Sequence, residues 1–130
     1  MEQAIKNKGV WAAALAGLLA ASAAPAAAAS DRFTEMQFNS TATELRQLMD
    51  RLNSLTDDLS HERDFTRGCR LLGQAISMQK DGQILAERLA GYARQLGFGD
   101  GEEEAVRVHN MLLENRHAKE ADYARLCQGS

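Results

Sequence analysis

The residues of this sequence with the clearest chemistry are two cysteines, because a pair of thiols can be oxidised to a disulfide. They are Cys69 and Cys127, and each lies 29 residues from Phe98, one before it and one after it. Phe98 belongs to a glycine-rich stretch, 97–101, that predicts a turn. Two antiparallel helices folded at this turn would bring the sulfur atoms level, as a disulfide requires Cα atoms within about 7 Å. The spacing therefore predicts one internal disulfide; two free thiols or bonds between chains are the alternatives.

Histidine, glutamate and methionine side chains could hold a cofactor, but their spacing gives weak support for one. Glu114 and His117 form a Glu-x-x-His unit, which di-iron bundle proteins use in pairs, and the sequence has no second unit. A b-type haem between helices would use one histidine and one methionine. The candidate ligands are His109, His117, Met49, Met78 and Met111. Because methionines at helical spacing usually fill cores, we expect no cofactor and no metal, and a periplasmic haem or iron carrier is the alternative hypothesis.

No motif of a catalytic centre occurs in the sequence. It lacks a Cys-x-x-Cys pair, a glycine-rich phosphate loop, a Gly-x-Ser-x-Gly elbow and a His-Glu-x-x-His zinc motif. The net charge is −3, and the basic residues are interspersed with acidic ones. A surface that binds nucleic acid would instead need clustered lysines and arginines. We therefore expect neither enzymatic activity nor nucleic-acid binding.

The first 29 residues have the pattern of a signal peptide. Lys6 and Lys8 form a short basic region, 10–24 is an apolar run, and the alanines at 27–29 favour cleavage before Ser30. The run is shorter than the ~20 residues of a membrane-spanning helix, and an uncleaved anchor is the alternative. We expect export to the periplasm or the medium, where cysteines become oxidised, and no membrane attachment after cleavage.

Apolar residues at helical spacing predict an all-α domain over 40–130, preceded by an N-terminal arm over 30–39. The sequence does not decide whether this arm is a frayed extension or an irregular segment. The first predicted helix, 40–59, has leucines alternately three and four residues apart, the heptad spacing of coiled coils and bundles. These leucines are Leu45, Leu48, Leu52, Leu55 and Leu59. Ser60 is the predicted N-cap of the helix that follows.

The second predicted helix, 61–96, contains the dipeptide Asp81-Gly82, which commonly marks a turn. An apolar row keeps one phase across it, and a turn would reset that phase. The row consists of Leu71, Ala75, Met78, Gly82, Leu85, Leu89, Tyr92 and Leu96. We therefore predict one continuous helix. A second row, confined to the N-terminal half, indicates contact with two neighbours there; it consists of Phe65, Cys69, Leu72 and Ile76.

Gly97 is predicted to end the second helix in the left-handed conformation, and Asp100 to cap the third helix, 101–127. These lengths predict a small three-helix bundle, built on a long antiparallel hairpin with one disulfide. The first helix would cover only the disulfide half of the hairpin. The remainder, 81–116, would then project as two helices with exposed apolar residues.

An exposed apolar patch usually marks an interface, so the sequence predicts binding to a protein partner or to a second copy of the chain. The predicted interface residues are Leu85, Leu89, Tyr92, Leu96, Phe98, Val106, Leu112 and Leu113. The alternative is that the first helix, or the arm before it, lies further along the hairpin and covers these residues.

Overall fold

The computed structural model describes residues 29–128, and within them three long α-helices account for nearly every residue. The helices are α3 (Ala29–His61), α4 (Phe65–Leu96) and α5 (Gly99–Cys127). No strand occurs in the described range, so the predicted all-α fold with three helices is confirmed. The predicted signal peptide lies, apart from its last residue, outside the described residues. None of the described helices is long and apolar enough to span a membrane.

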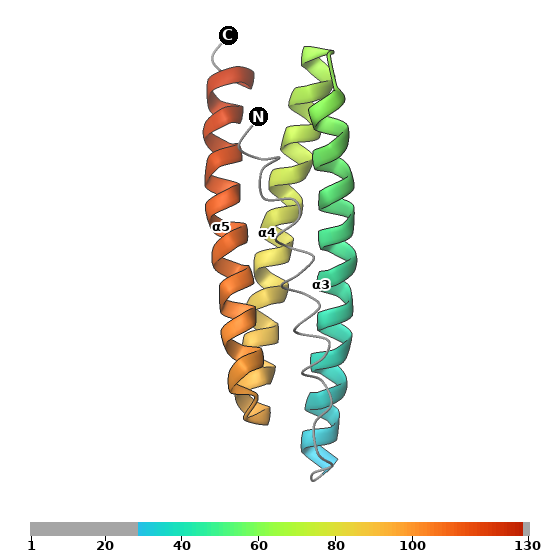
Figure 1. The fold of residues 1–130 in the computed structure, drawn as a ribbon, viewed down its shortest axis with the longest axis vertical. Helices are drawn as coiled ribbons and strands as arrows, with labels where there is room; N and C mark the ends of the chain where they lie inside the picture. The colour runs from blue at the N-terminus through green and yellow to red at the C-terminus, as the bar shows by residue number, and fades with distance from the viewer. Residues whose placement is uncertain (1–28, 129–130) are drawn as a thin grey trace.

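The three helices run up, down and up, with α4 between the other two (Figure 1). Both α3 and α5 pack along α4, whereas they make few contacts with each other. The core lies where their inward rows meet. Its fully buried members include Phe38, Leu45, Leu52, Leu89 and Leu112. The α4 helix thus provides most of the surface against which α3 and α5 pack.

The α4 helix is continuous through Gly82, as the unbroken apolar row predicted. The reason for a glycine here is the close approach of all three helices. A β-carbon at Gly82 would lie 3.0 Å from Leu112 Cδ1 on α5 and 3.2 Å from Leu48 Cδ2 on α3. Since both leucines are buried, only a residue without a side chain fits without displacing them.

Two faces of α4 are in contact with neighbours over its whole length, not only in its N-terminal half. Leu85, in the predicted apolar row, lies beside α3, whereas Gln79 and Glu87 contact α5. The prediction that two neighbours contact this helix only in its N-terminal half was wrong. The continuation of the second row is small or polar and so does not stand out as hydrophobic; it comprises Gln79, Gln83, Ala86, Ala90 and Ala93, all buried.

The segment 30–39, predicted as an arm outside the helices, belongs to α3. Phe38 anchors it: this side chain is fully buried, and its ring meets that of Phe98 edge-on at a centroid distance of 5.6 Å. Phe98 lies at the α4–α5 turn, so α3 reaches the end of the hairpin far from the disulfide. The predicted two-helix projection over 81–116 therefore does not form, and the arm covers the hairpin instead.

The helix ends agree with the predictions in part. Gly97 has φ 73°, and Phe98 N–H donates to the Ala93 carbonyl at 2.8 Å, which closes α4 as predicted. Ser60 does not cap α4, because α3 continues through it; Asp64 caps α4 by accepting a 2.8 Å hydrogen bond from the backbone N–H of Arg67.

The predicted cap of α5 is also corrected. This helix begins at Gly99, so Asp100 lies inside its first turn, and no side chain caps the helix.

Cys69 and Cys127 lie at disulfide distance, as their spacing predicted: their sulfur atoms are 2.08 Å apart and their Cα atoms are 5.8 Å apart. The pair joins the start of α4 to the end of α5, at the end of the hairpin opposite its turn. Such a pair is consistent with an oxidising compartment.

Candidate functional site

The eight residues predicted to form an interface occupy different environments. Leu89 and Leu112 have no exposed surface and lie in the core. Five others are partly buried: Leu85, Tyr92, Leu96, Phe98 and Leu113. Val106 is 44% exposed. This distribution arises because α3 is long enough to cover the hairpin. Of the eight residues, Val106 and Leu85 line surface grooves.

One groove of about 450 Å³ runs between α3 and α4. Its floor contains Leu48 and Leu85, and Ile84 stands at its surface with half of its area exposed. Charged side chains surround this apolar strip: Glu44 and Arg51 on α3, and Asp81 and Arg88 on α4. Ile84 is not among the predicted interface residues, because it lies one position outside the apolar row that packs on α3.

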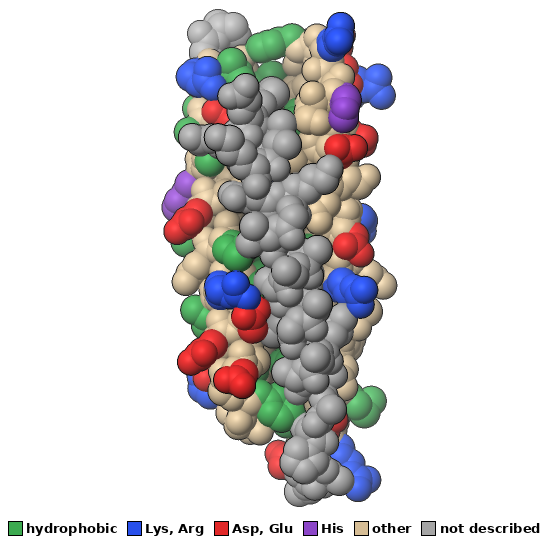
Figure 2. Space-filling view, viewed as in Figure 1, with side chains coloured by type: hydrophobic (Ala, Val, Ile, Leu, Met, Phe, Trp, Pro, Cys, Tyr) green, Lys and Arg blue, Asp and Glu red, His purple; other side chains and the backbone are tan. Residues whose placement is uncertain are grey.

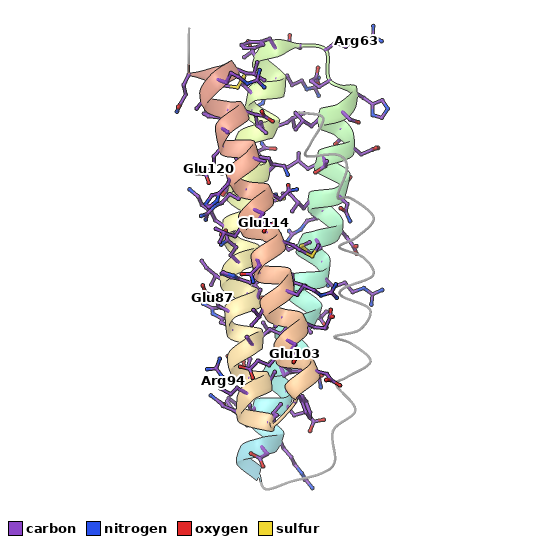
Figure 3. The ribbon with its side chains drawn as sticks, turned by 60° about the vertical axis from the view of Figure 1, so that its left-hand side comes forward. Arg63, Glu87, Arg94, Glu103, Glu114 and Glu120 are labelled. Atoms are coloured by element: carbon purple, nitrogen blue, oxygen red, sulfur yellow. A yellow bond between two sulfur atoms is a disulfide. The ribbon has the colours of Figure 1, made fainter. Side chains whose placement is uncertain are left out.

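A second groove, of about 660 Å³, follows α5. Val106 and Met111 supply its apolar surface, and Glu103 and Glu114 lie along it on the same helix (Figure 3). Acidic side chains also gather over the N-terminal half of α5 (Figure 2). Negative charge in the first helical turn is favourable because of the unpaired backbone N–H groups there, so helix stability alone accounts for part of this acidity.

Polar side-chain contacts join α4 to α5 at the surface. Arg94 Nε lies 2.7 Å from Glu102 Oε2, and His109 Nε2 lies 3.1 Å from Glu87 Oε1. Exposed pairs of this kind contribute at most about 1 kcal/mol each. His109 is therefore a boundary residue with a partner on the neighbouring helix.

A polar cluster interrupts the core between α4 and α5. Gln79 and Lys119 have no exposed surface and Asn115 has almost none. Gln79 Nε2 donates to Asn115 Oδ1 at 2.7 Å, and Lys119 Nζ donates to the same oxygen. The Oε1 atoms of Gln79 and Gln83 are buried and accept no hydrogen bond from the described residues. Sequence patterns could not find this cluster, because polar residues at core positions look like the solvated side of a helix.

Burial lowers the pKa of Lys119 from 10.5 to about 8, and the negative charge of Asp122 opposes part of this effect. A lysine with such a pKa is partly neutral just above neutral pH, as nucleophilic lysines are. However, Lys119 is enclosed by the helices and not presented to a solute in a cleft. We therefore interpret the cluster as a structural feature that fixes how α5 is set against α4.

The candidate cofactor ligands lie in different environments. His117 is exposed, His109 is bound to Glu87 at the α4–α5 boundary, and Met49 is buried in the core on α3. Met78 and Met111 pack against the core. Within residues 29–128, no group of three or more His, Cys, Asp or Glu side chains is arranged to hold a metal ion. No observation on the described residues favours the haem or iron carrier over a binding protein.

No protein-family model matches this chain, and neither a curated protein nor a solved structure shows significant similarity to it.

Proposed function

We propose that the protein is an exported helical module that binds another protein surface, either a partner or a second copy of itself, and that catalyses no reaction. The observation that carries this proposal is the composition of two grooves, one between α3 and α4 and one along α5. Each has a branched aliphatic side chain at its surface, Ile84 at 50% exposure and Val106 at 44%, surrounded by charged residues. An apolar centre with a polar rim is the usual anatomy of a protein interface.

Export is supported by two independent features. The leader has the three-part pattern of a signal peptide, and the cysteine pair at bonding distance suits the periplasm or the exterior, where disulfides persist. A disulfide also adds stability to a domain of this size, whose hydrophobic core is small. A small, oxidised, rod-like bundle with surface grooves is well suited to hold a partner by helix packing.

The proposal is tested by photo-cross-linking in the native host. A photoreactive phenylalanine derivative is introduced separately at Ile84, at Val106 and at Arg63. Arg63 is the control, because it lies exposed in the turn between α3 and α4, away from both grooves (Figure 3). We expect discrete cross-linked products from position 84 or 106 and none from 63. Absence of products from both groove positions in the oxidised, exported protein would contradict the proposal.

A further inference from the structure

The two helices that form the α3–α4 groove carry the same pattern of residues. In each, an acidic residue is followed by a leucine four positions later and by an arginine three positions after that. The residues are Glu44, Leu48 and Arg51 on α3, and Asp81, Leu85 and Arg88 on α4. Four- and three-residue spacings place such residues on one side of a helix. Each of the two helices therefore lines the groove with an acidic residue, a leucine and an arginine, in that order along the chain.

Because α3 and α4 are antiparallel, the two patterns run in opposite directions. The contact of Gly82 with Leu48 shows which residues of α3 lie beside which residues of α4. Towards the disulfide end of the groove, Arg51 on α3 is therefore level with Asp81 on α4. Towards the other end, Glu44 is level with Arg88. The four charges thus alternate in sign around a rectangle, and Ile84 lies near its centre.

None of these four charged residues forms an ion pair or a side-chain hydrogen bond with any residue of the described range. Elsewhere on the surface, some charged residues pair within the chain. Arg94 pairs with Glu102, for example, and Arg107 pairs with Glu104. The groove between α3 and α4 therefore has unpaired charge of both signs around an apolar residue that is half exposed.

We propose that this face binds the same face of a second copy of the chain, so that α3 and α4 of both copies form a four-helix interface about a two-fold axis. This inference depends on the proposed binding function and names its partner. In a two-fold interface, one patch must complement itself. The alternating rectangle does so: with the axis along the bundle, Arg51 meets Asp81 of the second copy, and with the axis across it, Arg51 meets Glu44 of the second copy.

The remaining contacts are also complementary in both orientations. Glu44 meets an arginine of the second copy in each case, and so does Asp81. Ile84 of each copy then lies at the centre of the interface, where burial of an aliphatic side chain contributes most to affinity. The charges around it specify the partner more than they stabilise the complex. A partner of uniform charge would instead meet two like charges on this face.

The test uses charge reversal in the protein purified in its exported, oxidised form. The variant Glu44→Arg/Asp81→Arg has four basic residues around the groove, and the variant Arg51→Glu/Arg88→Glu has four acidic ones. Sedimentation velocity from micromolar to submillimolar concentration measures the dimer dissociation constant. We expect each variant alone to dimerise about a hundredfold more weakly than wild type, because like charges face each other. An equimolar mixture of the two should recover a dimer, since opposite charges then meet.

The matched control is Arg63→Glu/Arg70→Glu, which reverses two exposed arginines outside both grooves and should leave the dissociation constant unchanged. Circular dichroism checks that all variants are folded. The proposal is overturned if wild type stays monomeric over the whole range, if the reversed variants dimerise like wild type, or if the mixture does not recover. Photo-cross-linking separates the two failures. A product with a different protein at position 84, or products at position 106 alone, refutes the second copy on this face but keeps the binding function, whereas no product at either position refutes both.

Discussion

The side-chain amide of Gln79 donates a 2.7 Å hydrogen bond to Oδ1 of Asn115, which joins α4 to α5 inside the core. The same oxygen accepts from Lys119. A buried polar cluster of this kind adds little net stability compared with apolar side chains. Each of its polar groups nevertheless needs its hydrogen-bond partner, because leaving a buried polar group without one is costly. The cluster therefore restricts α5 to one register along α4.

Loss of the shared acceptor should be strongly destabilising. Asn115→Leu keeps a similar side-chain volume but leaves the buried Gln79 amide without the acceptor it uses, so we expect the free energy of unfolding to fall by about 3 kcal/mol. Urea unfolding at neutral pH, followed by circular dichroism, measures this change. The control Asn110→Leu, at an exposed position of the same helix, should change stability by less than about 0.5 kcal/mol. Equal stability of the two variants would show that the hydrogen bonds at Asn115 contribute nothing.

Lys119 should make stability depend on alkaline pH. Its pKa is about 8 in the folded protein, below the 10.5 that is usual for a lysine exposed to water in the unfolded chain. Below pH 8 the ammonium is charged in both states, so the full penalty of burying it is present. As pH rises from 8 to 10.5, the folded state releases the proton first, and stability should increase by up to about 3 kcal/mol.

The measurement for Lys119 is urea unfolding at several pH values from 7 to 10, compared with Lys119→Met. Methionine has a similar length and no charge, so the variant should lose the alkaline increase and be at least as stable as wild type at pH 7. A wild-type profile that is flat, or that falls between pH 8 and 10, would contradict the buried, partly neutral lysine.

Regular apolar spacing made the helices predictable, whereas contacts made by small or polar residues were not. The leucines of 45–59 and the continuous row through Gly82 indicated long helices, and Gly97 indicated where α4 ends. The α5-facing side of α4 contains Gln79, Ala86 and Ala93, which carry little hydrophobic pattern although all three are fully buried.

The extent of α3 was not predictable for a related reason. Its N-terminal part is mostly polar, and only the contact of Phe38 with Phe98 decides that it packs against the hairpin. That contact joins residues 60 positions apart, so no local pattern reveals it. The groove between α3 and α4 was missed as well, because its charged residues resemble an ordinary solvated face until the level of the two helices is known.

Two glycines of α4 should respond in opposite ways to the same substitution. Gly91→Ala meets no atom within 4 Å, so the gain in helix propensity should raise the free energy of unfolding by about 1 kcal/mol. Gly82→Ala gains the same propensity but pushes a methyl group against Leu48 and Leu112. Overpacking of this kind costs about 1–3 kcal/mol, so we expect a net loss. Thermal and urea unfolding of both variants test this, and stabilisation by Gly82→Ala would show that the helices are less closely packed at this level.

The disulfide should contribute about as much stability as a large core side chain, because it closes a loop with a sequence separation of 58. The loop-entropy model gives about 4 kcal/mol for such a loop, and measured values are often lower. We expect Cys69→Ser/Cys127→Ser to lower the free energy of unfolding by about 2–4 kcal/mol, since the unfolded chain gains freedom and the ends of α4 and α5 separate more easily. Dithiothreitol provides the internal control: it should destabilise wild type by the same amount and leave the double variant unchanged. Two results together would contradict the disulfide in the exported protein: a peptide map of the non-reduced chain that shows both thiols free, and a free energy of unfolding that dithiothreitol does not change.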